Sequence, residues 1–218
     1  MAYLEHFKLD VAPFGLMPDP EFVYWSNQHA RAKAYMESTT WLSDGFVVIT
    51  GEISFGKTTL LQSFLNKSDD DVVCSVVSQA QLTATQFLQS VLTESGFKPF
   101  DKKKVELRDM LNMFFIEQHS AGKKVILIVD EAQNLSSKVL EEIRLLSGIE
   151  TSTEKVLRII LAGQPESKDT LDAPRLKQLV QRVRLHFHLG ALSFRKRPPS
   201  SAGKSMKTRP ADIMSCRS

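Results

Sequence analysis

The chain has 218 residues, of which 42% are hydrophobic, and this composition is enough for one domain with a buried core. No run approaches the roughly 18 consecutive apolar residues of a membrane span, and Glu5, Lys8 and Asp10 stand where a secretory signal would need an apolar core, so we expect a cytoplasmic protein without a transmembrane segment. The two cysteines and five histidines suggest neither a disulfide framework nor a metal-ligand set.

Residues 1–45 are expected to form an N-terminal arm and a helix. The arm, up to Tyr24, is punctuated by prolines and carries several aromatic residues. Ser26 or Asn27 can cap the helix, which we expect to continue to about Ser43.

A phosphate-binding motif follows this helix. Residues 46–50 are β-branched and aromatic, which indicates a buried strand, and residues 59–65 have apolar side chains at helical spacing. Between them, Gly51–Thr58 fits the pattern G-x-x-x-x-G-K-[ST] in the strand, loop and helix context that this pattern requires. The alternative is a glycine turn that caps an ordinary helix.

The chemistry of this loop suits a nucleoside triphosphate and Mg²⁺. A helix N-terminus offers unpaired N–H groups and the positive end of a dipole to phosphate, and Gly51 and Gly56 let the backbone turn tightly enough to aim those groups. Lys57 can reach the β- and γ-phosphates, and the Thr58 hydroxyl can ligate Mg²⁺. The residues expected to contact the nucleotide are Gly51, Glu52, Ile53, Ser54, Phe55, Gly56, Lys57, Thr58 and Thr59.

The chain up to residue 193 then alternates strands with helices. Apolar, β-branched runs indicate buried strands, and Gly96 and Gly122 are placed to terminate helices. This alternation predicts an α/β fold with a parallel five-stranded sheet, covered by helices on both faces, over residues 46–193. The expected strands are 46–50, 72–77, 124–129, 156–161 and 183–189, and the expected helices are 59–65, 83–94, 104–119, 136–146 and 175–182.

A second motif lies at the end of the strand at 124–129. Asp130 at this position can hold Mg²⁺ through water, and Glu131 can polarise the attacking water as a general base. Open α/β sheets bind ligands at the carboxyl ends of their strands, where the phosphate loop also lies. An acidic turn after a core strand is the alternative, and the neighbouring phosphate loop disfavours it.

Residues 194–218 have a different character. They hold seven of the 28 Lys and Arg residues and one of the 25 Asp and Glu residues, so the overall charge of +3 belongs to this segment and the rest of the chain is mildly acidic. The segment has no periodicity and little to bury, which predicts a disordered basic tail. The acidic body gives no support for a strongly nucleic-acid-binding core.

With these motifs in place, the chain resembles the AAA-type ATPases of the general secretion pathway protein A (ExeA) family, including the exosortase-locus (PEP-CTERM) secretion ATPases. The resemblance covers about residues 3–193 and implies a RecA/AAA-like P-loop NTPase fold, ATP and Mg²⁺ as ligands, and ATP hydrolysis. It also implies a homo-oligomer or a membrane-associated export machinery as partner. Beyond the two nucleotide motifs, the resemblance rests on the segments Pro13-Phe14, Pro18-Asp19-Pro20, His29–Ala32, Leu140–Ser147, Leu161–Glu166 and Gln178–Arg182.

The resemblance implies two further catalytic residues. Gln164, at the end of the fourth expected strand, takes the position of a sensor that reads the γ-phosphate and positions water; a turn glutamine before Pro165 is the alternative. Arg182 resembles an arginine finger that reaches a neighbouring subunit's nucleotide and stabilises transition-state charge. Arg184 is the fallback for that role, and a helix-surface arginine without a catalytic part is the alternative.

The chain departs from the family at two places. The family usually has a third glycine in the loop where this chain has Ser54, followed by the bulky Phe55. Serine costs about 1 kcal/mol if that position has a positive φ angle. The resemblance stops at 191–193, where the family continues into a small helical lid. We expect that this lid is missing, and a frameshift or truncated reading frame is our leading hypothesis for the tail.

Three functions follow from these features. The first is an ATPase that supports secretion or cell-envelope export and assembly. The second is an ATP-gated DNA-binding accessory of the transposition-helper type, which the basic tail favours slightly and the acidic body disfavours. The third is a truncated nucleotide binder with little turnover, which Ser54 and the missing lid favour.

Overall fold

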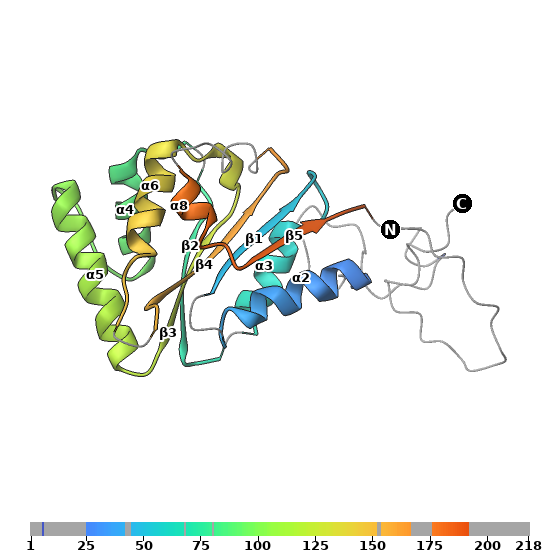
Figure 1. The fold of residues 1–218 in the computed structure, drawn as a ribbon, viewed down its shortest axis with the longest axis horizontal. Coiled ribbons are helices and arrows are strands. Elements are labelled where there is room, and N and C mark those ends of the chain that lie inside the picture. The colour runs from blue at the N-terminus through green and yellow to red at the C-terminus, as the bar shows by residue number, and fades with distance from the viewer. Residues whose placement is uncertain are drawn as a thin grey trace.

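The computed structural model describes residues 6, 25–41, 45–67, 69–79, 81–151, 154–166 and 176–191. The expected arm before Trp25 lies outside these residues apart from His6, and the expected tail lies outside them entirely. A central sheet separates two layers of helices, with α4, α5 and α6 on one side and α2 and α3 on the other (Figure 1). Among the helices of the described residues, none combines the length and the apolar character that a membrane-spanning helix needs.

The five strands of the sheet are all parallel, in the order β2-β3-β4-β1-β5, which confirms the predicted fold class. β1 pairs with β4 on one side and β5 on the other, so that Val48 lies beside Leu161 and His186. β4 therefore lies between β1 and β3, and the carboxyl ends of these three strands meet at one edge. The strands are β1 Phe46–Gly51, β2 Val72–Val77, β3 Lys124–Val129, β4 Leu157–Gly163 and β5 Leu185–Leu189.

Alternating side chains of the sheet build a core on each face. Val125, Leu127 and Val129 of β3 belong to the core under α4, α5 and α6, whereas Ile126 and Ile128 belong to the core under α2 and α3. β3 is thus buried on both faces, as its continuous apolar run predicts. The helices are α2 Asn27–Ser38, α3 Lys57–Leu65, α4 Ala84–Glu94, α5 Lys104–Ser120, the 3₁₀ turn η2 Ala132–Asn134, α6 Ser137–Leu146 and α8 Lys177–Val180.

Local signals account for most of the helix boundaries. Ser26 caps α2 and Ser136 caps α6, each accepting a hydrogen bond from a main-chain N–H three residues later. Thr83 and Gln86 form a reciprocal capping box at the start of α4. Gly96 and Gly122, each one residue past the C-cap of α4 and α5, have φ angles of 89° and 78°, as expected for glycines that terminate helices.

The expected helix from Ser26 to about Ser43 was too long, because α2 ends at Ser38. Three consecutive hydroxyls, on Ser38, Thr39 and Thr40, each donate to the carbonyl three residues earlier, at 2.6, 2.6 and 2.7 Å. These bonds tighten the last turn and offer the backbone an alternative to further helix.

The region before β5 also differs from expectation. The expected helix 175–182 is reduced to the single turn α8 in the described residues, and β5 begins at Leu185 instead of Val183. The main-chain N–H groups of Arg182 and Val183 donate to Leu179 and Val180, so a turn occupies the two residues that were expected at the helix end and the strand start.

Candidate nucleotide-binding site at the carboxyl edge of the sheet

The phosphate loop joins the end of β1 to the start of α3. Gly56 has a φ angle of 83°, and α3 begins at the next residue, Lys57. A Cβ at Gly51 would lie 2.8 Å from the Leu189 carbonyl oxygen of β5, so only glycine fits there without displacing the neighbouring strand. Ser54 has a φ angle of 65°, in the left-handed region that a third glycine would favour.

Lys57 folds back inside this loop. Its side-chain ammonium donates to the carbonyl oxygens of Gly51 and Glu52 at 2.7 and 2.8 Å, and the residue is only 7% exposed. The loop carbonyls thus hold a positive charge among main-chain N–H groups at a helix N-terminus. Both features favour an anion at this position.

The two predicted magnesium ligands are in direct contact. The Thr58 hydroxyl at the start of α3 donates to Asp130 Oδ2 at 2.9 Å, although the residues are 72 positions apart. Asp130 follows β3 and is buried, and its other carboxylate oxygen accepts the main-chain N–H of Glu131 at 2.9 Å. A hydroxyl and a carboxylate oxygen are hard oxygen donors of the kind that Mg²⁺ prefers, so these two residues would be suited to hold it.

Glu131 and Gln164 face the phosphate loop across a pocket of about 370 Å³. Gln164 follows β4, and the strand order places the end of β4 between the ends of β1 and β3. Glu131 has a φ angle of 54°, which is uncommon for a residue other than glycine. The pocket is lined by Ile53, Ser54, Gly56, Lys57, Thr58, Thr59, Glu131 and Gln164.

The sequence motifs assign no role to two residues that support this site. Gln133 donates to the Glu131 carboxylate and accepts the main-chain N–H of Gln164 at 3.0 Å. His29 of α2 donates from Nε2 to the Phe55 carbonyl oxygen of the loop at 3.0 Å. The positions of Ala32 and Met36, three and seven residues after His29, already place this histidine on the buried face of α2.

The sequence matches the family model of the AAA domain over residues 42–171. The chain belongs to the AAA domain family. It is also 35% identical over 193 residues to General secretion pathway protein A of Aeromonas hydrophila, which confirms the resemblance found in the motifs. This match covers 88% of the chain but 35% of that protein, so the chain spans about a third of the relative's length.

Solved structures agree on the fold of this AAA domain. The ORC2 protein of Aeropyrum pernix superposes with a TM-score of 0.58 at 15% identity, over 77% of this chain and 48% of that one. Cdc6p of Pyrobaculum aerophilum superposes with a TM-score of 0.55 at 15% identity, over 78% and 49%. At this identity the likeness shows the fold alone.

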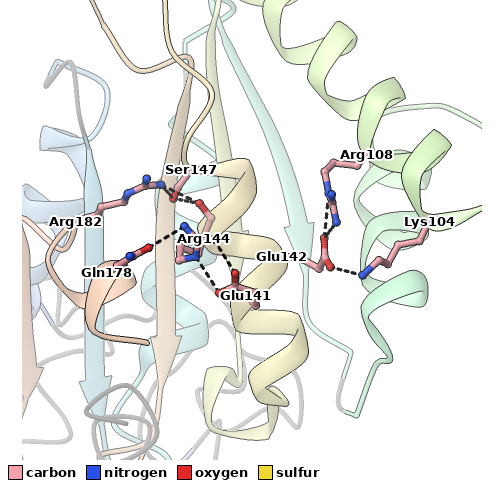
Figure 2. Close-up of polar contacts among 8 residues, drawn as sticks. All are labelled: Lys104, Arg108, Glu141, Glu142, Arg144, Ser147, Gln178 and Arg182. Atoms are coloured by element: carbon pink, nitrogen blue, oxygen red, sulfur yellow. Dashed lines mark hydrogen bonds and ion pairs between the residues drawn. The ribbon is translucent and has the colours of Figure 1, made fainter. Parts of the chain in front are cut away.

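Arg182 lies at the opposite edge of the sheet from the phosphate loop. It lines a second pocket, of about 190 Å³, together with Phe46 and Leu157, the first residues of β1 and β4, and with Arg184. Its guanidinium donates from one nitrogen to the Arg144 carbonyl oxygen at 2.8 Å and the Ser147 hydroxyl at 2.5 Å (Figure 2). Arg182 thus binds the carboxyl end of α6.

Charged residues attach α6 to its neighbours on two sides (Figure 2). Glu142, 3% exposed, forms ion pairs with Lys104 and Arg108 of α5 at 2.8 and 2.7 Å. On the other side, Arg144 donates to Glu141 and to Gln178 of α8. The hydrogen bond from Arg144 holds the pKa of the Glu141 carboxyl below its ordinary value.

His186 and His188 lie on the exposed face of β5. One ring nitrogen of each lies 3.2 Å from the Thr50 hydroxyl, which immediately precedes the phosphate loop. No group of three or more metal-ligating side chains occurs in the described part of the chain.

Proposed function

We propose that this AAA domain binds ATP with Mg²⁺ and hydrolyses it to ADP and phosphate. The contact between Thr58 and Asp130 carries the proposal, because it joins the two nucleotide motifs at one point beside Lys57. A glycine turn at an ordinary helix would not need a buried carboxylate on its first hydroxyl. Glu131 also lines the pocket beside this contact, which supports a part for its carboxylate in activating the water that attacks the γ-phosphate.

Each residue has a definite part in this reaction. Lys57 exchanges its bonds to the loop carbonyls for bonds to β- and γ-phosphate oxygens. Thr58 and Asp130 hold Mg²⁺, which when bound neutralises charge on the phosphate oxygens. Glu131 takes a proton from the attacking water, and Gln164 donates a hydrogen bond to that water or to the γ-phosphate.

Arg182 is proposed to act on the nucleotide of a second copy of the chain. Its bonds to Arg144 and Ser147 would have to be exchanged for phosphate oxygens in such an assembly. Arg184, which lines the same pocket, is the alternative donor. A role in secretion or cell-envelope export rests on the likeness to General secretion pathway protein A, of which this chain spans about a third.

Two substitutions test binding and turnover separately. Lys57→Ala should abolish tight binding of ATP with Mg²⁺ in calorimetry, because it removes the charge inside the loop. Glu131→Gln should bind ATP as wild type does but release phosphate about 10²–10⁴-fold more slowly. Glu94→Gln, an exposed glutamate at the end of α4, is the matched control.

Hydrolysis of ATP by Glu131→Gln at the wild-type rate would refute the assignment of Glu131 as the general base. Unchanged affinity in Lys57→Ala would refute the binding site. Phosphate release should be measured with and without DNA, because strong stimulation by DNA would favour the transposition-helper type of function over an export ATPase.

A further inference from the structure

The side chain of Gln133 connects Glu131 to Gln164. Its amide nitrogen donates to the Glu131 carboxylate, and its amide oxygen accepts the main-chain N–H of Gln164 at 3.0 Å. The two partners determine the orientation of the amide, because a main-chain N–H can only donate and an ionised carboxylate can only accept. Gln133 therefore needs both a donor and an acceptor at this position.

The path of the backbone makes this connection possible. Glu131 adopts a left-handed conformation and η2 follows it at once, so the chain turns back and brings the Gln133 side chain beside the Glu131 carboxylate. Glu131 and Gln164 both line the pocket beside the phosphate loop, and Gln133 does not. Gln133 thus lies behind the two residues that face the nucleotide and joins the end of β3 to the end of β4.

We propose that Gln133 is a positioning residue for ATP hydrolysis. It holds the Glu131 carboxylate toward the pocket and ties it to the end of β4, so that a displacement of Gln164 moves the general base as well. A neutral amide suits this task, because a lysine or arginine here would bind the carboxylate as a cation and lower its basicity. The inference rests on the proposed function, in which Glu131 is the general base.

Three variants test the proposal through the kinetics. Gln133→Met keeps an unbranched side chain of similar length but removes donor and acceptor, and should lower kcat by about ten- to a hundredfold, because the base is no longer held in place. KM for ATP should stay unchanged, since Gln133 does not line the pocket. Asn134→Ala, which removes an exposed amide from the same turn, should keep the wild-type kcat.

Gln133→His gives a pH-dependent rescue that a merely structural role would not produce. A neutral imidazole offers one donor and one acceptor, so this variant should recover most of the kcat at pH ~8. Protonation removes the acceptor for the Gln164 N–H, so kcat should fall, relative to wild type, as the pH decreases through ~6.5. A kcat of Gln133→Met equal to or above that of wild type would overturn the proposal.

Amide hydrogen exchange tests the connection itself without turnover. The Gln164 N–H should exchange about tenfold faster in Gln133→Met than in wild type, because its acceptor is lost. Equal exchange rates would overturn the inference whatever the kinetics show. Absence of phosphate release by the wild type would instead refute the proposed hydrolysis, and the exchange rate of Gln164 would still decide whether Gln133 holds the end of β4.

Discussion

The phosphate loop contains one residue whose backbone conformation opposes its side chain. Ser54 has a φ angle of 65°, where a residue with a Cβ costs about 1 kcal/mol more than glycine. The resemblance to the family already predicts an unfavourable serine at this position, because the family usually has glycine there. The positive φ angle of Ser54 is the physical reason why glycine is favoured. With serine, the loop spends a smaller part of its time in the conformation that aims its N–H groups at phosphate.

Ser54→Gly should therefore bind ATP with Mg²⁺ more tightly, by as much as about tenfold, since ~1.4 kcal/mol corresponds to that factor. Ser54→Ala is the matched control, because it removes the hydroxyl and keeps the Cβ, and its affinity should not increase. Calorimetry on the three proteins measures the difference. An equal affinity in Ser54→Gly and wild type would show that the surrounding loop holds this conformation without help from the residue.

At the scale of elements, local patterns predicted which segments are strands and helices but not how they pair. The five strands and most helix ends follow from apolar periodicity and caps, such as Thr83 with Gln86. The order of the strands depends on contacts between distant segments, and only that order brings Gln164 beside Gln133. The motif could therefore identify Glu131 from its place after a strand. The hydrogen bonds that join Gln133 to Glu131 and Gln164 could be found only in the structure.

The N-terminal turn of α2 contacts both the phosphate loop and the residue that follows β5. His29 donates from Nε2 to the Phe55 carbonyl oxygen, and its other ring nitrogen lies 2.7 Å from the Ser26 hydroxyl. The ring also lies 3.0 Å from where a Cβ on Gly56 would be, so it packs against the loop. Gln28 accepts the main-chain N–H of Gly190 at 2.7 Å, just after β5. α2 thus holds the phosphate loop and the end of β5 together.

His29→Phe should weaken ATP binding by about tenfold, because it fills the space but leaves the Phe55 carbonyl oxygen without its donor. His29→Gln should keep most of the affinity, since its amide nitrogen can take the place of Nε2 and donate to the same oxygen. Calorimetry gives the affinities, and melting temperatures separate loss of binding from loss of fold. Equal weakening by both variants would show that the bulk of the imidazole matters more than its hydrogen bond.

At the scale of the whole molecule, the phosphate loop and Arg182 lie at opposite edges of the sheet. The phosphate loop lies at the carboxyl edge, whereas Arg182 lies at the amino edge beside Phe46. β1 runs from Phe46 to Gly51, so these edges are separated by roughly 17 Å of strand. Arg182 therefore does not serve the loop of its own chain, and a catalytic part for it requires a second copy.

Mixed assemblies of two inactive variants test this requirement. Lys57→Ala should not bind nucleotide tightly but keeps Arg182, and Arg182→Ala keeps the phosphate loop but cannot offer Arg182 to a neighbour. If Arg182 completes the site of another copy, mixing the two should restore part of the phosphate release, because some loops then face an intact arginine.

Arg182→Ala should also lower the melting temperature, because the Ser147 hydroxyl loses its donor and the Arg144 carbonyl oxygen keeps only the hydrogen bond from that hydroxyl. Ser147→Ala removes one of these acceptors without touching the arginine, and therefore controls for the stability of α6. Phosphate release by Ser147→Ala should stay close to that of wild type. In both proteins the rate of phosphate release should rise with protein concentration as assemblies form. If Arg182→Ala alone hydrolyses ATP as fast as wild type, or if mixing restores nothing while both variants remain folded, then Arg182 serves only to bind the end of α6.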